Sequence, residues 1–210
     1  MPTSPALKRN GWGGDRNRAG RISTELTEKQ VAATFAAADR ALAIGLPFNR
    51  FITLHLEAIG YSDSEAGTAI GGYLKLVGDF LARRGLSTAW RYIRENDEGD
   101  GRKGSHVHIY LHWPAGPSFG KLQQKWVRNL AGKQTPRRSV RTRRIGGTAS
   151  AWDAAPALYR ANLHKVLCYG LKGAPEAVAR LYGLDRHGEG GRIIGKRCGQ
   201  SQNLGGGSLK

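Results

Sequence analysis

The sequence predicts an α+β fold in which an antiparallel sheet carries helices mainly on one face and a functional site on the other. The central part of the chain alternates between strand and helix patterns in the order β-α-β-β-α-β, which is typical of the split βαβ arrangement. Hydrophobic residues make up 40% of the chain and charged residues 23%, which is ordinary for a globular domain. A chain of 210 residues is also long enough to bury a core.

The first predicted elements are a helix, a strand and a second helix. Thr27 and Gln30 have the spacing of a capping box, and apolar residues follow at helical intervals until the turn residues near Pro47. Residues 51–56 are rich in β-branched and apolar side chains and are flanked by turn residues, which predicts a strand. Residues 64–84 carry apolar side chains at helical spacing, which predicts the second helix.

The next elements are two strands joined by a glycine-rich turn, which is typical of a hairpin. These strands span residues 88–95 and 105–112. Prolines end the second of them, and a helix over 118–130, a short strand over 140–145 and a helix over 156–171 follow. The last helix has proline in its first turn, where the missing amide proton costs nothing because it would have no partner.

We expect the chain to divide into three segments. Residues 1–22 are rich in glycine, arginine and asparagine, which predicts a flexible basic arm. Residues 23–186 hold the predicted helices and strands and form one domain. Residues 187–210 are glycine-rich and polar, which predicts a C-terminal tail.

The charge indicates the class of partner. The chain holds 33 lysine and arginine residues against 16 acidic ones, a net charge of +17, and such an excess favours nucleic acid as the ligand. No apolar stretch is long enough to span a membrane, and residues 1–20 lack the apolar segment of a secretion signal. Two cysteines, Cys168 and Cys198, are too few for a disulfide framework. We therefore expect a cytoplasmic protein without a membrane partner.

A row of histidines follows one face of the strand predicted over 105–112. Because side chains alternate along a strand, His106, His108 and His112 point to one face, and the apolar residues that alternate with them point into the core. Mg²⁺ or Mn²⁺ bound by imidazoles also needs a carboxylate, and Glu95 lies across the predicted hairpin. The pattern predicts a metal site, with His112 as an additional ligand. A row of inert, exposed histidines is the alternative.

The last predicted helix carries a tyrosine beside two lysines. Tyr169 and Lys172 are three residues apart and share a helix face, and Lys165 lies one turn earlier. Ammonium groups favour the tyrosine anion, which is the nucleophilic form. Such spacing is also common by chance.

Basic residues gather before this helix and on it. We expect them to contact the phosphates of a nucleic acid and to make binding steeply dependent on salt. A basic loop without defined structure is the other interpretation, and it would also bind DNA. The residues are Lys133, Arg137, Arg138, Arg141, Arg143, Arg144 and Lys165.

Three motifs within residues 48–173 resemble, in their order, those of the HUH endonucleases, and in particular the rolling-circle replication initiators with a single nucleophilic tyrosine. They are the strand FITLHLEA, the His-x-His segment HVHIYLH and the Tyr-x-x-Lys segment YGLK. The βαββαβ core predicted above is similar to that family's fold. The resemblance implies that residues 23–186 form a nuclease domain.

The resemblance also implies a role for each candidate residue. His106 and His108 would bind Mg²⁺ or Mn²⁺ with Glu95 as the third ligand, and Tyr169 would attack the scissile phosphate with help from Lys172. Glu95 lies further ahead of the histidines than in many relatives, which is a departure from the family pattern. No second tyrosine stands beside Tyr169, which argues against a two-tyrosine initiator.

The implied activity is metal-dependent nicking and joining of single-stranded or hairpin origin DNA through a 5′-phosphotyrosine bond, in a plasmid, phage or integrated element. A host polymerase and a helicase are the implied partners. A relaxase or single-strand transposase on the same fold is one alternative, and a non-catalytic nucleic-acid-binding module is another. A covalent adduct that depends on Tyr169 would separate an enzyme from a binding module.

Overall fold

A five-stranded antiparallel sheet forms the centre of the protein and confirms the predicted α+β class. The computed structural model describes residues 20–97, 104–131, 139–146, 151–188 and 190–205. The strands of the sheet are β2 (Arg50–His55), β3 (Trp90–Asp97), β4 (Gly104–Leu111), β5 (Val140–Arg144) and β7 (Cys198–Gln200). They lie in the order β5-β2-β4-β3-β7, and each neighbouring pair is antiparallel.

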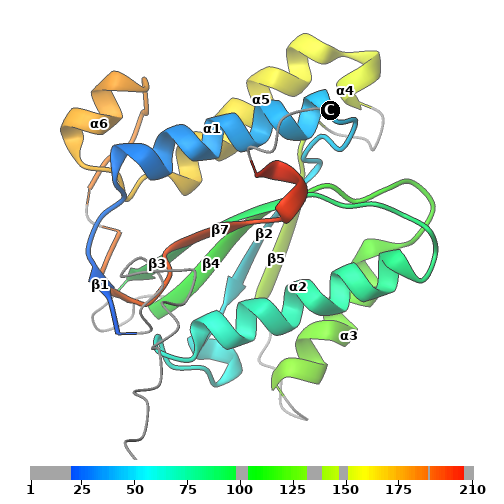
Figure 1. The fold of residues 1–210 in the computed structure, drawn as a ribbon, viewed down its shortest axis with the longest axis horizontal. Coiled ribbons are helices and arrows are strands. Elements are labelled where there is room, and N and C mark those ends of the chain that lie inside the picture. The colour runs from blue at the N-terminus through cyan, green and yellow to red at the C-terminus, as the bar shows by residue number, and fades with distance from the viewer. Residues whose placement is uncertain (1–19, 98–103, 132–138, 147–150, 189, 206–210) are drawn as a thin grey trace, which may run out of the picture.

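Helices lie on both sides of this sheet. They are α1 (Glu28–Ala43), α2 (Ala66–Ala82), α3 (Phe119–Ala131), α4 (Ala151–Ala154), α5 (Pro156–Gly170) and α6 (Glu176–Leu181), with single 3-10 turns at Glu57–Ile59 and Gln202–Leu204. In the view of Figure 1, α1 and α5 lie above the sheet and α2 and α3 below it. The protein is therefore layered as helices, sheet and helices.

Local sequence determines where α1 begins. Thr27 accepts a hydrogen bond from the backbone of Gln30, and the Gln30 side chain accepts one from the backbone of Thr27, so both halves of the predicted capping box are present. The first four amides of a helix lack partners within it, and this box satisfies two donors at the helix start. The predicted start of the first helix is thus confirmed.

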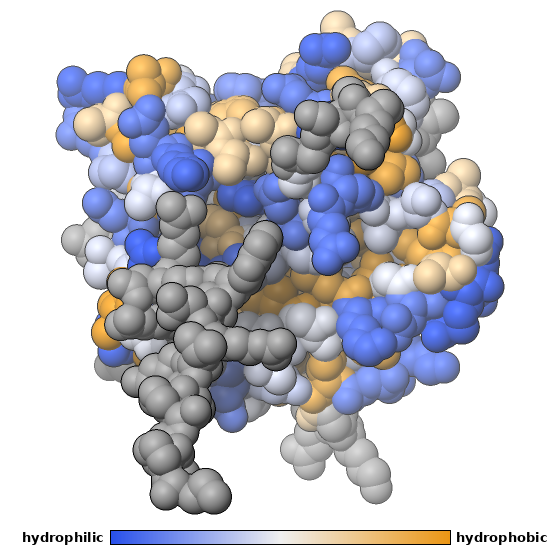
Figure 2. Space-filling view, in the orientation of Figure 1, coloured by the Kyte–Doolittle hydropathy of each residue, from blue (hydrophilic) through white to orange (hydrophobic). Residues whose placement is uncertain are grey.

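Alternation along the strands divides the core into two clusters. Val107 and Ile109 of β4 pack with α2 and α3 below the sheet. Phe51 of β2 and Tyr110 of β4 pack with α1 and α5 above it. Figure 2 shows hydrophobic side chains in the hollow between α1 and α2, where both layers meet the sheet. Both faces of the sheet are thus buried by helices.

The prediction that helices lie mainly on one face is wrong. The upper face presents Phe51, Ile93 and Tyr110, which are at most 6% exposed beneath α1 and α5. These apolar side chains need a covering layer, because exposing them to water would forfeit about 25 cal/mol for each Å². The histidine face is therefore only partly open, at the end of the sheet that these helices leave uncovered.

The described residues of the segment expected to be a tail belong to the folded domain. β7 pairs with β3, and β6 (Ile193–Ile194) pairs with β1 (Ile22–Ser23), which includes the last residue of the expected arm. Residues 1–19 lie outside the described part. A Cβ at Gly199 would lie 2.4 Å from a ring atom of Tyr92, so only glycine lets β7 approach β3 this closely.

A buried arginine ties this segment to the sheet. Arg94 of β3 is 1% exposed and donates hydrogen bonds to the carbonyl oxygens of Ile194 and Lys196 and to Asp63. Removing the carboxylate of Asp63 would leave the buried guanidinium of Arg94 without its counter-charge, which destabilises a protein far more than the loss of a surface ion pair.

Among the described residues, no helix is both long and apolar enough to cross a membrane.

Candidate metal centre and tyrosine groove

Three side chains from adjacent strands converge on the upper face of the sheet. The β3–β4 register sets Glu95 opposite His106, and His108 lies two residues further along β4 on the same face. One carboxylate oxygen, Oε2 of Glu95, lies 3.2 Å from Nε2 of His106 and 3.3 Å from Nε2 of His108. The three side chains are at most 2% exposed. The hairpin register thus builds the predicted trio.

The second nitrogen of each imidazole determines what the first can do. Nδ1 of His106 lies 2.9 Å from the carbonyl oxygen of Gly104, which can only accept a hydrogen bond, so Nδ1 carries the proton. In a neutral ring Nε2 is then an acceptor, and it faces the carboxylate of Glu95, which is also an acceptor. Only a proton or a cation between these two atoms makes such a close approach favourable.

His108 is held in a similar way. Its Nδ1 lies 3.0 Å from the hydroxyl oxygen of Thr53 on β2, which can accept a hydrogen bond from the ring. Burial lowers the pKa of His108 and outweighs the opposite effect of Glu95, so the ring is neutral at pH 7. A neutral imidazole is the form that binds a metal ion.

Glu95 stays ionised although it is buried. Burial by itself would raise the pKa of its carboxyl group, but hydrogen bonds with His106 and His108 outweigh it, and the charge of Lys172 adds to them, so the pKa lies well below its usual range. Nζ of Lys172 lies 3.0 Å from Oε2. The other oxygen, Oε1, is buried and has no hydrogen-bond partner among the described residues.

This donor set fits a divalent cation. The ligand atoms of Glu95, His106 and His108 all lie within 4.8 Å of one another. Two neutral imidazole nitrogens and one carboxylate are a common set for divalent transition metals. The unpartnered Oε1 and the facing acceptors are the features that a bound cation would satisfy. The structure thus confirms that the predicted Glu-His-His group could bind a metal ion.

His112 does not belong to this group, so its prediction as an additional ligand is wrong. β4 ends at Leu111, and Nδ1 of His112 lies 2.8 Å from the carbonyl oxygen of Pro47. Four residues along a strand correspond to about 13 Å, which is too far for His108 and His112 to share one ion. Alternation predicts which face a side chain points to, but it says nothing about distance along the strand.

Helix α5 brings Tyr169 to the histidines. The rings of Tyr169 and His108 meet edge to face with centroids 5.3 Å apart. The next residue is Gly170, where a Cβ would lie 2.0 Å from the Tyr110 hydroxyl, so glycine is what lets α5 approach the sheet this closely. By contrast Tyr159, which lies on a different face of α5 from Tyr169, is buried, and its hydroxyl donates a hydrogen bond to the carbonyl of Phe48.

Two cations lie close to the ring of Tyr169. Nζ of Lys172 is 5.4 Å from the ring centroid and the Arg186 guanidinium is 5.8 Å from it. Burial lowers the pKa of Lys172, but Glu95 outweighs it and raises the pKa, so the amine is charged at neutral pH. Lys172 therefore cannot act as a general base, and its charge can stabilise only an anion beside it.

A groove of about 540 Å³ opens over the histidines, and we call it the tyrosine groove. Its charged side chains come from β5 and α5 and are all basic. The register pairs Arg141 with Thr53 and Arg143 with Phe51, which turns both arginines toward the histidine face. It is lined by Phe51, Thr53, His55, Ala58, His106, His108, Arg141, Arg143, Lys165, Val166 and Tyr169.

The predicted phosphate-binding residues do not all share this groove. Arg141, Arg143 and Lys165 line it, but Arg144 pairs with Arg50 and points to the opposite face of the sheet. Alternation along β5 explains the difference, because successive side chains of a strand point in opposite directions. Lys133, Arg137 and Arg138 lie outside the described residues.

Several residues of the site are absent from the sequence-based prediction. Phe51, Thr53 and His55 alternate along β2 and face the groove, and this alternation within FITLHL was a readable signal. Arg186 follows α6 in a loop, and no local pattern connects it with Tyr169. A second opening of about 400 Å³ is lined in part by Glu95, Lys172 and Arg186.

Comparison with known proteins adds no family to this description. No protein-family model, no curated protein and no solved structure matches the chain.

Proposed function

We propose that this protein is a metal-dependent DNA endonuclease that nicks and rejoins a single strand through a covalent bond to Tyr169. One observation carries the proposal. The ring of Tyr169 packs directly against His108, a member of the buried Glu-His-His group, at the base of a groove whose charged side chains are all basic. A nucleophile, a cation site and phosphate-binding residues thus meet in one place.

Each side chain has a distinct task in the proposed reaction. Glu95, His106 and His108 would hold Mg²⁺ or Mn²⁺, which when bound neutralises charge on the scissile phosphate. Arg141 and Arg143 hold neighbouring phosphates of the strand in the groove.

The covalent step conserves the phosphodiester bond. The Tyr169 hydroxyl loses its proton to solvent, and its oxygen forms an ester with phosphorus while the bond to the 3′ oxygen breaks. The 3′ oxygen takes up a proton and leaves as a hydroxyl group. The charge of Lys172 stabilises the tyrosine anion before the attack, because its amine stays protonated beside the ring. A later 3′ hydroxyl can reverse the step and rejoin the strand.

This chemistry suits initiation of rolling-circle replication in a plasmid, phage or integrated element. A free 3′ end at the nick is a primer for a host polymerase, and a helicase would expose the strand. Single-stranded or hairpin origin DNA is the proposed substrate. Both cysteines are free, in agreement with the cytoplasm as the proposed location.

A denaturing gel tests the proposal. The protein is mixed with a diverse pool of single-stranded DNA and Mn²⁺, beside Tyr169→Phe and the matched control Tyr182→Phe, a half-buried tyrosine that stacks on Phe35 outside the groove. We expect a covalent protein–DNA band with the unmodified chain and with Tyr182→Phe, none with Tyr169→Phe, and none after removal of metal. A band that persists in Tyr169→Phe would contradict the assigned nucleophile. DNA binding without a band would favour a non-catalytic binding module.

A further inference from the structure

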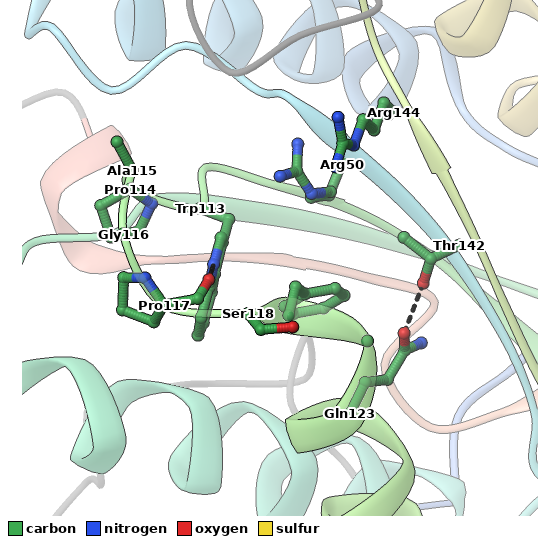
Figure 3. Close-up of a pocket in the computed structure, with 12 residues that line it drawn as sticks. Arg50, Trp113, Pro114, Ala115, Gly116, Pro117, Ser118, Gln123, Thr142 and Arg144 are labelled. Atoms are coloured by element: carbon green, nitrogen blue, oxygen red, sulfur yellow. Dashed lines mark hydrogen bonds between the residues drawn. The ribbon is translucent and has the colours of Figure 1, made fainter.

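A second basic cavity lies on the opposite face of the sheet, and we call it the arginine pocket. Its volume is about 590 Å³. It is bounded by the start of β2, the end of β5, the loop after β4 and the first turn of α3. Figure 3 shows Arg50 and Arg144 on one side of it and Trp113 with the following loop on the other. The lining residues are Arg50, Trp113, Pro114, Ala115, Gly116, Pro117, Ser118, Phe119, Gly120, Gln123, Thr142 and Arg144.

Two like charges stand side by side in this pocket. Arg50 and Arg144 are register partners on β2 and β5, and none of the twelve lining residues is acidic. Arg50 is only 7% exposed, and the one hydrogen bond of its side chain among the described residues goes to the carbonyl of Asn49. Burial lowers the pKa of Arg50, and the charge of Arg144 lowers it further. An anion between the two guanidinium groups would relieve this repulsion and use their free donors.

A buried amide with a free donor also lines the pocket. Gln123 is 4% exposed, and its Oε1 accepts a hydrogen bond from the hydroxyl of Thr142 at 2.7 Å. Its Nε2 is buried and has no acceptor among the described residues. A buried donor without a partner is rare in folded proteins and marks a place where a ligand or an ordered water supplies the acceptor.

The backbone of α3 adds further donors. Phe119 and Gly120 open this helix of 13 residues and line the pocket. Amides in the first turn of a helix lack partners within it, and the helix dipole favours an anion there. The pocket thus combines two arginines, a buried amide and a helix start, all of which carry hydrogen-bond donors of the kind that bind an anion.

We propose that the arginine pocket binds one nucleotide of single-stranded DNA, with its phosphate between Arg50 and Arg144. A volume of about 590 Å³ exceeds what a phosphate alone fills and lies within the range of small-molecule sites. The loop residues Pro114, Ala115 and Pro117 line the pocket, are not buried, and offer apolar surface to the sugar and base.

Strand β5 connects this pocket with the tyrosine groove. Arg143 faces the groove and Arg144 faces the pocket, because successive side chains of a strand point to opposite faces. β5 is an edge strand of the sheet, so a DNA strand that passes over this edge contacts both arginines in turn. The proposal rests on the proposed function only for the identity of the ligand, since it requires DNA binding but no nicking.

The test therefore measures binding without chemistry. Fluorescence anisotropy of a labelled oligothymidylate is recorded over a series of salt concentrations in the Tyr169→Phe background without metal, so that failure to nick cannot affect the result. Arg144→Gln is compared with Arg128→Gln, an exposed arginine of α3 outside the pocket. We expect Arg144→Gln alone to weaken binding and to reduce the slope of log K against log salt by about 0.7, the loss of one phosphate contact on a single strand.

A second variant guards against an indirect effect. Gln123→Glu keeps the shape of the side chain and an acceptor for Thr142, but it places a carboxylate beside the proposed phosphate. We expect it to weaken oligothymidylate binding while the melting temperature stays at or above that of the parent, since the new charge partly neutralises the arginines. Equal affinity in Arg144→Gln and Arg128→Gln would overturn the proposal. So would thymidine 5′-monophosphate or inorganic phosphate binding as tightly as the oligonucleotide, because the pocket would then belong to a free phosphate compound.

Discussion

The two faces of β4 are equally buried but are stabilised in different ways. Val107, Ile109 and Leu111 are fully buried and pack on α2 and α3 through apolar contacts alone. His106 and His108 are at most 2% exposed on the other face, yet each ring nitrogen has a polar atom within hydrogen-bond distance. Burial on the first face maintains the fold, and burial on the second removes water from a set of ligands. Exposure alone therefore does not separate core residues from site residues in this sheet.

The polar face is incomplete around Glu95, where one carboxylate oxygen lacks a partner and the other faces histidine acceptors. Oε2 of Glu95 lies close to Nε2 of both histidines and to Nζ of Lys172, while Oε1 remains without a partner among the described residues. An unsatisfied buried carboxylate oxygen destabilises a protein by about 1–3 kcal/mol. The histidine face thus lowers the free energy of unfolding, whereas the apolar face raises it. A bound cation would remove the penalty on the histidine face.

The largest effect is expected when one of the candidate metal ligands is removed. We expect His106→Ala to lower the affinity for Mn²⁺ by more than about a hundredfold, because one of three ligands is lost and outer-shell partners alone change affinity by 10–100-fold. Isothermal titration with Mn²⁺ measures the effect. His112→Ala is the matched control, since His112 has the same predicted face but lies beyond β4, and its affinity should not change. Equal losses in both variants would disprove the three-ligand site.

A smaller loss of metal affinity is expected when the change affects a residue that contacts a candidate ligand and is not a ligand itself. Thr53→Val keeps the shape of the side chain but removes the hydroxyl that holds Nδ1 of His108. We expect about a tenfold loss of Mn²⁺ affinity, measured by the same titration, with little change in stability. Thr142→Val on the neighbouring strand removes a hydroxyl that faces Gln123 below the sheet, and it should leave the affinity unchanged. If Thr53→Val binds Mn²⁺ as well as the parent, the hydroxyl does not position His108.

The smallest effect concerns the apolar face. Ile109→Val deletes one buried methylene next to His108, and we expect the free energy of unfolding to fall by about 1 kcal/mol. Urea unfolding measures this change, and titration with Mn²⁺ should give an unaltered affinity. A change in metal affinity with unchanged stability would show that the two faces are coupled through the strand and would refute their separation.

The candidate metal ligands could be predicted because the rules that bring them together are local. Alternation along β4 set His106 and His108 on one face, and the antiparallel hairpin set Glu95 opposite them. The capping box at Thr27 could be predicted for the same reason, since it depends on residues three apart. The prediction failed at His112, where distance along the strand mattered more than the face.

Distant contacts explain the other errors. The sequence pattern of residues 187–210 resembles a tail, but β7 completes the sheet because Gly199 fits against Tyr92. Likewise, both arginines at the end of β5 read as one basic patch, although Arg143 and Arg144 serve different cavities. Neither outcome follows from composition, because each depends on which partner the tertiary structure brings close.

The sequence by itself determined the α+β class, the order of the elements and the histidine, glutamate and tyrosine residues of the site. Only the tertiary structure decided that α5 packs on the histidine face, which Gly170 permits by leaving room for Tyr110. It also decided that Glu95 is shared by two histidines and Lys172, a contact between segments far apart in the chain. Periodicity determines the direction of a side chain, but the packing of helices on the sheet determines what that side chain meets.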